Sequence, residues 1–427
     1  MRNFISCKKE DIPDVLSDEI TYISQYKGLD KAGVDFFAPK LMDSIQKIGV
    51  EIPDLKWDFL TIALSINTID NIYNRNYSPD GWTREIGLKI AVLKPDVWNS
   101  LKNKFESVLR LLTGDFWHID FINNGMPPPL PRRHKEYSED CLCTLSGGMD
   151  SLIGAIDLIS AGKRPILVSR VANANVQSLF ARTIGPNLCH FQWGFYNSKG
   201  EITTRARSIV FIAFSIILSA AVQPILNAPI DIYLPENGFI SINPPLYYGR
   251  IGSYSTKTTH PIYINGLQEI LSTAGINVAI HLPYRFFTKG EMLSRCLNQK
   301  VLSQLLPASV SCGKYGRNHQ HCGKCIPCII RKSALFVANM QDRTARGYIN
   351  TDLLVALKNL ENANDQPSDI GAISKACYNY RNNGIDSVLR SSVAFASLDE
   401  RELYKGVIDR GFEEISLFLE SIGFDFS

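Results

Sequence analysis

The clearest pattern of hydrophobic and polar positions lies in the middle of the chain, where short apolar runs alternate with segments of helical periodicity. The runs that we expect to form strands are residues 141–145, 165–171, 188–193, 230–234 and 278–282. Parallel strands need a crossover between them, usually a helix, so this alternation predicts an α/β fold with a doubly wound parallel sheet. The longest apolar run, 209–222, is shorter than the roughly 20 residues of a membrane-spanning helix and therefore predicts a buried helix on this sheet.

The chain before residue 125 mixes short strands and helices in a less regular order. Four elements are expected there: a helix at 57–71, a strand at 82–92, a helix at 96–112 and a strand at 116–122. This mixture predicts a compact N-terminal α+β module. Residues 125–140 contain three consecutive prolines and several charges, which predicts an extended linker to the rest of the chain.

The chain after about residue 346 is charged and has helical spacing. Its most periodic segments are 351–362 and 398–422, so we expect a helical C-terminal region. Three domains follow from these patterns: residues 1–135 (the α+β module with its proline-rich linker), residues 136–345 (the parallel sheet with the motifs described below) and residues 346–427 (the helical region).

Composition and charge exclude several classes of protein. With 45% hydrophobic and 20% charged residues, the chain is neither disordered nor fibrous. The 45 Lys and Arg residues nearly balance the 42 Asp and Glu residues, and a net charge of +3 argues against a large nucleic-acid footprint or a polybasic membrane surface. The first residues contain no apolar signal segment. We therefore expect a cytoplasmic protein with no membrane partner and no nucleic acid as a direct partner.

The sharpest local motif is TLSGGMDS at residues 144–151, which follows an apolar strand and opens a helix at 152–160. Its two adjacent glycines let backbone amides approach an anion, and the helix N-terminus adds unpaired N–H donors and a partial positive charge. Ser146 and Ser151 can add hydroxyl donors, and Asp150 is expected to act through Mg²⁺ or as a helix cap. The plainer interpretation is a glycine-rich turn capped by Asp150 or Ser151.

The string SGGMDS at residues 146–151 resembles the pyrophosphate-binding loop of the N-type ATP pyrophosphatases, the PP-loop superfamily. The resemblance implies a HUP-type adenine-nucleotide-binding fold and a reaction in which ATP adenylates a carboxylate, carbonyl or amide-type oxygen and releases pyrophosphate. A nucleophile then displaces AMP. Donors around the departing pyrophosphate are the expected source of rate, with Asp150 as a catalytic residue. The implied ATP- and pyrophosphate-binding residues are Ser146, Gly147, Gly148, Asp150 and Ser151.

Four of the ten cysteines lie within a stretch of 17 residues and form the pattern C-x9-C-x2-C-x2-C. These are Cys312, Cys322, Cys325 and Cys328. In a chain without a signal segment such spacing favours a metal over disulfides, and four thiolates complete a tetrahedral zinc site with Zn–S distances of about 2.3 Å. The alternatives are a redox pair, an iron–sulfur cluster, or a site in which His319 or His321 replaces one thiolate.

A PP-loop followed by this cysteine cluster resembles 7-cyano-7-deazaguanine synthase, the QueC family. The string FTKGEM at 287–292 matches the Thr-Lys-x-Glu element of these enzymes. The resemblance implies that ATP adenylates a carboxylate similar to 7-carboxy-7-deazaguanine, and that ammonia or another amine then forms an amide or a nitrile. Lys289 is the catalytic cation that it implies near the phosphates; the alternative is a helix-start pair with Glu291.

The layout of the whole chain resembles a narrower group, the QueC-like proteins of bacterial defence loci, those of the Qat anti-phage system (QatC) in particular. The long segments on both sides of the QueC-like region carry this resemblance, together with PENG at 235–238 and TTHP at 258–261. It implies a role in antiviral defence, with other proteins of a defence operon as partners. The amine donor is then ammonia, a small amine or a protein.

The substrate segment of QueC, Gly-Tyr-x-Asp-Cys-Arg, is absent from this chain. Polar residues that begin at 234 take its place after a core strand, where open α/β sheets bind their ligands. We expect Glu236, Asn237 and Arg250 to bind the substrate. A plain surface loop is the alternative.

Two arginines, Arg205 and Arg207, lie at the start of the expected 209–222 helix. Positive charge at a helix N-terminus opposes the helix dipole and costs stability unless a partner offsets it. We therefore expect both arginines to be catalytic, by holding a phosphate or the substrate carboxylate. The alternative is that they extend to water.

Two other functions compete with the ligase. A PP-loop enzyme that thiolates a tRNA base would need a sulfur-carrying cysteine near the loop, and Cys141 and Cys143 lie in the preceding strand. A non-catalytic ATP-sensing scaffold of a defence complex would bind ATP without turning it over. The intact loop, Lys289 and Arg331 argue against a dead site.

Overall fold

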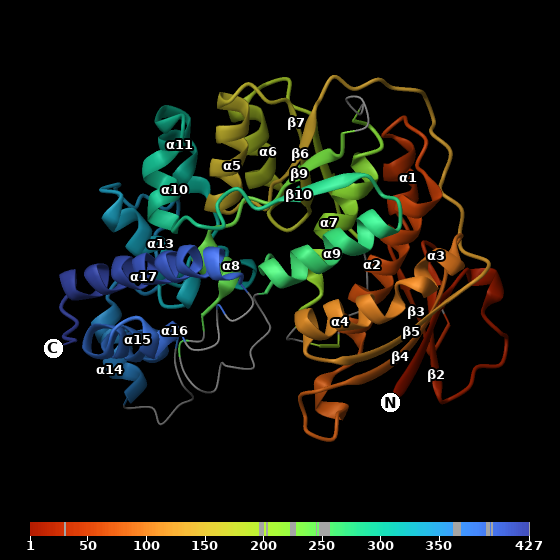
Figure 1. The fold of residues 1–427 in the computed structure, drawn as a ribbon, viewed down its shortest axis with the longest axis horizontal. Coiled ribbons are helices and arrows are strands. Elements are labelled where there is room, and N and C mark those ends of the chain that lie inside the picture. Colours follow the sequence, from red (N-terminus) through yellow and green to blue (C-terminus); the bar gives the residue numbers. More distant parts are fainter. Residues whose placement is uncertain are drawn as a thin grey trace.

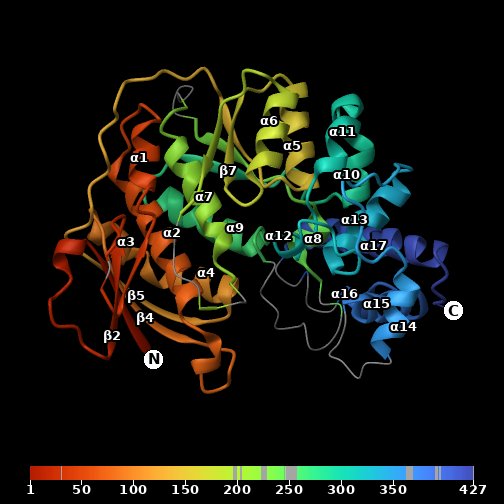
Figure 2. The same cartoon turned by 180° about the vertical axis from the view of Figure 1, so that it is seen from behind.

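The computed structural model places a parallel sheet at the N-terminal end of the molecule, a second parallel sheet at its centre and a group of helices at its C-terminal end (Figures 1 and 2). The structure describes all residues except 30, 196–199, 202–203, 223–227, 245, 247–256, 362–368, 390–392, 394–395 and 427.

The central sheet contains all five strands that the sequence predicts. They are β6 (Cys141–Thr144), β7 (Pro165–Arg170), β8 (His190–Trp193), β9 (Ile230–Tyr233) and β10 (Val278–His281). The strand order is β10-β9-β6-β7-β8 and every pairing is parallel, which confirms the doubly wound sheet. The connections leave β6 in opposite directions, so a ligand is expected in the crevice between the carboxyl ends of β6 and β9.

The N-terminal module contains a second parallel sheet. Its strands are β1 (Arg2–Cys7), β2 (Ile20–Gln25), β3 (Val34–Phe37), β4 (Glu85–Ala91) and β5 (Phe116–Ile122). The order β3-β2-β1-β4-β5 repeats that of the central sheet when the strands are counted along the chain. The module is thus α/β in topology rather than the expected α+β, because the pattern indicated only β4 and β5 and missed the partly exposed β1–β3.

Helices of four groups accompany the two sheets. The N-terminal module has α1 (Leu41–Gln46), α2 (Asp54–Ile72), α3 (Pro95–Ser100) and α4 (Lys102–Thr113). The central sheet has α5 (Met149–Ser160), α6 (Ala174–Ile184), α7 (Arg207–Leu218), α8 (Gly238–Ile242) and α9 (Pro261–Thr273). The region around the cysteines has α10 (Lys289–Arg295), α11 (Gln299–Leu305), α12 (Tyr315–Asn318) and α13 (Ile326–Val337). The C-terminal region has α14 (Leu353–Glu361), α15 (Asp369–Asn383), α16 (Asp386–Leu389) and α17 (Leu398–Ser421).

Between the two sheets, helices of the N-terminal module pack against helices that accompany the central sheet. α2 contacts α7 and α4 contacts α9, so four helices separate the N-terminal sheet from the central one (Figure 1). The residues of α2 from Trp57 to Asp70 are all buried, polar side chains included, as expected of a helix enclosed by other elements. One continuous core joins Phe4 and Trp57 to Leu142 and Ile209. The N-terminal module and the central sheet therefore pack as one body. The domain boundaries that the sequence suggests stay a prediction.

The C-terminal helices form a second core around α17. The segments 351–362 and 398–422 were expected to be helical, and α14 and α17 confirm this. α17 packs against α13, α15 and α8, the short helix that follows β9. At the contact with α8, the rings of Phe239 and Phe412 meet edge to face with centroids 5.4 Å apart. The C-terminal region is therefore tied directly to the carboxyl end of the central sheet.

The proline-rich segment 125–140 runs as an extended chain along the outer side of α1 before it enters β6 (Figure 1). It is anchored by backbone bonds, from Arg132 N–H to the Gln46 oxygen at 3.1 Å and from Lys135 N–H to the Gly49 oxygen at 2.9 Å. Across the described part of the chain, none of the helices combines the length and the apolar character that crossing a membrane requires.

Candidate active site and metal centre

The glycine-rich loop connects β6 to α5 at the carboxyl edge of the central sheet. Gly147 has a φ of +89°, which favours glycine, and Gly148 is the N-cap residue of α5. The two serines stabilise the turn: Ser146 Oγ accepts the Gly148 N–H at 3.2 Å and lies 3.1 Å from Ser151 Oγ. The loop therefore presents a helix N-terminus and two hydroxyls at the end of a central strand, which is an arrangement suited to an anion.

Asp150 lies in the first turn of α5 and is held by two other segments. Its Oδ1 accepts from Lys289 Nζ at 2.6 Å, and its Oδ2 accepts from Asn237 Nδ2 at 2.7 Å and from the Asn237 N–H at 3.2 Å. Asp150 and Lys289 are both buried. A buried charge pair of this kind is costly to break on one side, because the remaining charge loses its partner. Asp150 therefore joins the loop to the starts of α8 and α10 instead of capping its own helix.

Lys289 and Glu291 have separate roles at the start of α10. Thr288 is the N-cap, and its side chain and that of Glu291 form a capping box. Lys289 instead points to the glycine-rich loop and pairs with Asp150. The helix-start interpretation holds for Glu291, whereas Lys289 lies in the site.

A cavity of about 430 Å³ opens between β6 and β9 at this edge of the sheet, within the size range of small-molecule sites. The expected residues that line it are Ser146, Gly148, Asp150, Ser151, Arg207, Glu236 and Lys289. Gly147 and Asn237 are not lining residues, and Arg250 is outside the described residues.

Two arginines face this cavity, and only one of them was expected. Arg207 begins α7, and Arg170 is the last residue of β7. Among the described residues neither guanidinium pairs with an Asp or Glu. Burial and the nearby Arg207 lower the pKa of Arg170 to about 10, so it remains a cation at neutral pH. Two cations without a carboxylate partner favour the binding of an anion. Arg170 was missed although it ends a strand beside β6, where a ligand residue is expected.

Arg205 lies away from the cavity, contrary to the expectation that it is catalytic. Its backbone N–H donates to Asp70 Oδ2 at 2.5 Å, its Nη1 donates to the Thr113 oxygen, and its guanidinium lies 4.4 Å from the centroid of the Trp82 ring. Asp70 is itself paired with Arg84 at 2.6 Å in a buried ionic cluster. Arg205 therefore attaches the start of α7 to the N-terminal module, and this tertiary contact offsets its charge at the helix start.

Glu236 and Asn237 follow β9 and have different functions. Glu236 faces the cavity and accepts from Thr258 Oγ1 at 3.2 Å and from Thr259 Oγ1. Burial raises the pKa of Glu236, and the charge of Asp150 adds to this effect. Asn237 is fully buried, caps α8 and binds Asp150. Glu236 is therefore a buried carboxyl group with a raised pKa at the cavity, and Asn237 is a support for Asp150.

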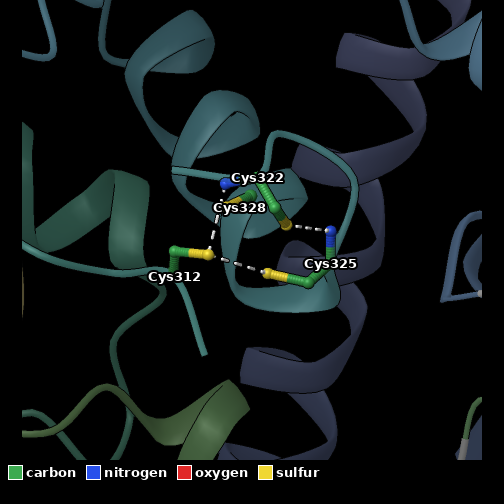
Figure 3. Close-up of side chains that lie close together, drawn as sticks. All are labelled: Cys312, Cys322, Cys325 and Cys328. Carbon is green, nitrogen blue, oxygen red and sulfur yellow. Dashed lines mark hydrogen bonds between the residues drawn. The ribbon is translucent and has the colours of Figure 1, made fainter. Parts of the chain in front are cut away.

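The four clustered cysteines converge at the start of α13 (Figure 3). Their sulfur atoms lie within 4.8 Å of one another. In a tetrahedral site with Zn–S distances of about 2.3 Å, the sulfurs are roughly 3.8 Å apart. Backbone N–H groups of Lys314 and Cys322 point to Cys312 Sγ, each at 3.3 Å, as expected for a sulfur that carries negative charge. All four side chains are buried, and the cluster fits a zinc knuckle.

The local sequence explains the shape of this knuckle. Gly323 has a φ of +84°, and a β-carbon there would lie 2.2 Å from the Asn350 oxygen. His321 is outside the ligand group: its Nε2 accepts the Ser311 N–H at 3.2 Å. His319 is also outside the group of ligand atoms found among the described residues. A four-cysteine site is therefore favoured over one with a histidine.

The knuckle is connected to the glycine-rich loop through the segment before Cys312. Val310 N–H donates to the Gly147 oxygen at 2.9 Å. Arg331 of α13 is fully buried and donates to Ser309 Oγ at 2.6 Å and to the Leu306 oxygen at 3.2 Å. The four-cysteine knuckle thus supports one wall of the cavity, and Ser311 and Pro327 next to its cysteines are lining residues.

The cysteines of β6 do not provide a reactive sulfur. Cys141 and Cys143 are both fully buried. Burial raises the pKa of the Cys143 thiol to about 12 and also raises the pKa of Cys141. Since a thiolate is the nucleophile in sulfur transfer, these residues disfavour the thiolation hypothesis.

Comparison with known proteins supports one family. The model of the family described as "Queuosine biosynthesis protein QueC" matches residues 258–339, a segment that contains Lys289 and all four clustered cysteines. The match supports a QueC-like member of the PP-loop superfamily, and with it an ATP-using synthase in general. Searches of curated proteins and of solved structures found no match.

Proposed function

We propose that the protein is an ATP-dependent ligase that forms AMP and pyrophosphate. One observation carries the proposal: the buried Asp150–Lys289 pair joins the glycine-rich loop to the QueC-like segment at the edge of a cavity lined by two arginines that have no carboxylate partner among the described residues. Anion donors on several sides of a small cavity suit a polyphosphate that becomes more charged as its bond breaks. The QueC-like segment favours a carboxylate similar to 7-carboxy-7-deazaguanine as the second substrate.

The first step that we propose is adenylation. A carboxylate oxygen attacks the α-phosphorus of ATP, the bond from that phosphorus to the bridging oxygen breaks, and pyrophosphate leaves. The amides at the start of α5, together with Ser146 and Ser151, would bind the departing pyrophosphate. Lys289, Arg170 and Arg207 would offset the charge of the phosphates. Mg²⁺, when bound, would supply further neutralisation beside Asp150.

The second step is attack by an amine on the acyl adenylate. The carbon–nitrogen bond forms, AMP leaves with the carbon–oxygen electron pair, and the amine loses a proton. Glu236 would accept that proton, because it faces the cavity and burial raises its pKa. The product is an amide, or a nitrile if the amide is dehydrated further. Ammonia, a small amine and a protein amine are the donors to compare.

A part in antiviral defence, with other proteins of a defence operon as partners, is the broader role that we propose. It rests on the layout of the chain, in which an N-terminal module and a helical C-terminal region flank the QueC-like segment. The residues around the cavity and the four-cysteine site would be the same in a defence protein and in a free-standing synthase. A test of operon proteins as the amine that attacks the acyl adenylate separates these two roles.

The test is product analysis with ATP labelled in the α and γ phosphates, Mg²⁺ and a panel of 7-deazaguanine carboxylates. We expect AMP and pyrophosphate, with Lys289→Ala as the inactive control. Formation of ADP and phosphate contradicts the proposal. Binding of ATP without turnover, with every acceptor and partner, favours the non-catalytic scaffold.

A further inference from the structure

Helix α17 of the C-terminal region supports both elements that hold Asp150. Asp150 is bound by Lys289, the first residue of α10, and by Asn237, the N-cap residue of α8. α8 and α10 have five and seven residues, and helices this short are not stable without tertiary contacts. α17 has 24 residues and contacts both of them. The positions of both partners of Asp150 therefore depend on α17.

Glu414 of α17 binds the backbone on both sides of Lys289. Its Oε1 accepts from the Thr288 hydroxyl, and its Oε2 accepts from the Gly290 N–H at 3.3 Å. The charged groups that act on Glu414 are Glu291 of α10 and Arg410 of its own helix. Glu414 is thus a polar anchor for the three residues that include the site lysine.

Arg410 lies one turn before Glu414 and makes a second contact with the same segment. Its Nε donates to Glu291 Oε1 at 2.8 Å, and its Nη2 donates to the Phe286 oxygen at 2.8 Å. Glu291 in turn accepts the Thr288 N–H at 2.8 Å in the capping box. Arg410 therefore holds the cap of α10 through the side chain of Glu291 and the backbone oxygen of Phe286.

The contact between α17 and α8 is close and apolar. A β-carbon at Gly411 would lie 2.2 Å from the Phe239 ring, so only glycine permits this approach. Phe239 is two residues after Asn237. α17 therefore fixes the second partner of Asp150 by packing, as it fixes the first by polar contacts.

We propose that α17 acts as a clamp on the site, in which Glu414 and Arg410 are positioning residues that hold Lys289 against Asp150. This inference rests on the proposed function, which assigns Lys289 and the loop of Asp150 to the phosphates of ATP. Neither Glu414 nor Arg410 lines the cavity. They act through α10, and a displaced lysine loses rate because small errors in the position of a charged group weaken its effect on the transition state.

The test compares Glu414→Ala and Glu414→Gln with a control, Glu413→Ala. Glu413 is the preceding residue of the same helix and pairs with Arg381 of α15 at 2.6 Å, so its loss removes an ion pair without touching α10. Two rates are measured for each variant: pyrophosphate release, and acetylation of Lys289 by acetic anhydride followed by peptide mass spectrometry. The second rate needs no turnover, and the buried, paired Lys289 of the wild type should react slowly.

We expect Glu414→Ala to slow pyrophosphate release by about 10- to 100-fold and to accelerate acetylation of Lys289 severalfold. Glu414→Gln keeps groups that can bond Thr288 and Gly290, so both rates should stay near those of the wild type. Glu413→Ala should leave both unchanged. If Glu414→Ala fails to fold, Arg410→Ala provides the same comparison, because its side chain is 46% exposed.

Unchanged acetylation of Lys289 in Glu414→Ala and in Arg410→Ala overturns the clamp, whatever happens to pyrophosphate release. A wild type that releases no pyrophosphate, while acetylation of Lys289 still depends on Glu414, overturns the proposed function and leaves the clamp in place.

Discussion

The two parallel sheets have the same strand order but differ at the crevice where that order reverses. In the central sheet, a glycine-rich loop and the N-terminus of α5 follow β6, and a cavity of about 430 Å³ lies beside them. In the N-terminal sheet, the side chain of Gln25 closes the corresponding crevice between β1 and β4. Its Nε2 donates to the Ser6 oxygen and to the Ala91 oxygen, both at 3.0 Å, and Gln25 is fully buried.

The difference teaches that strand order places a crevice but does not make it a binding site. β1 is followed by Lys8 and a short 3-10 helix, Lys9–Asp11, instead of a glycine pair and a long helix. A 3-10 helix of three residues does not give β1 the group of aligned N–H donors that the start of a long helix offers an anion. Gln25 satisfies the polar backbone groups that a ligand would otherwise meet. We therefore assign a supporting role to the N-terminal sheet and the proposed chemistry to the central sheet.

The largest expected effect comes from the zinc knuckle, which stands beside the central sheet. Cys325→Ser should lose one zinc per chain and much of the stability, because binding of structural zinc contributes about 10–16 kcal/mol in zinc-finger peptides. Metal analysis and thermal unfolding measure this. Cys377→Ser, at a buried cysteine of α15, should keep its zinc. An iron chromophore, or no metal in protein purified without chelators, contradicts a zinc site.

The next effect is on rate at the open crevice. Asp150→Asn should slow AMP and pyrophosphate formation by about 10²–10³-fold, as is typical when one stabilising group is lost from the transition state. Asparagine has nearly the same shape but leaves the buried Lys289 without its charge partner, so the melting temperature should fall as well, and the rates are compared at a temperature where both proteins are folded. Normal turnover by this variant would remove Asp150 from the chemistry.

A smaller effect is expected at the closed crevice. Gln25→Ala leaves the Ser6 and Ala91 oxygens without their donor and should lower the free energy of unfolding by about 1–3 kcal/mol. Because Gln25 belongs to the supporting sheet, kcat and KM for ATP should stay at wild-type values. Urea unfolding and steady-state kinetics test the two statements separately. A loss of rate as large as that of Asp150→Asn would break the distinction between the sheets.

The last effect is a pH dependence of stability at Glu414. Burial raises its pKa to about 7, so the folded state binds this proton more tightly than the unfolded state does. The contribution to stability is present below the ordinary pKa near 4.5 and is lost as the pH rises through 7. The melting temperature of the wild type should therefore fall, relative to Glu414→Gln, between about pH 5 and about pH 8. Parallel profiles for the two proteins would contradict the raised pKa.

Local patterns predicted the parts of the structure that local physics decides. All five strands of the central sheet, the glycine-rich loop and the four-cysteine group follow from apolar runs, glycine spacing and cysteine spacing. Strands β1–β3 were missed because they are partly exposed and polar residues interrupt them, so they lack the apolar run of a buried strand.

Long-range contacts decided the parts that the sequence could not predict. Arg205 and Arg207 are two residues apart, yet Asp70 attracts the first into the N-terminal module while the second faces the cavity. Arg170 reaches the cavity only through the order of the strands. Glu414 supports Lys289 across more than a hundred residues of sequence. None of these contacts leaves a periodic signal in the chain.

Carboxylate-dependent exchange of labelled pyrophosphate into ATP tests the central claim most directly. Exchange requires that adenylation is reversible and that pyrophosphate returns to the glycine-rich loop, and it needs neither the amine nor a partner protein. The wild type should exchange label only when a 7-deazaguanine carboxylate is present, Asp150→Asn should show almost no exchange, and Gln25→Ala should match the wild type. Absence of exchange with every carboxylate, or exchange that persists in Asp150→Asn, would contradict an adenylating site at the carboxyl edge of the central sheet.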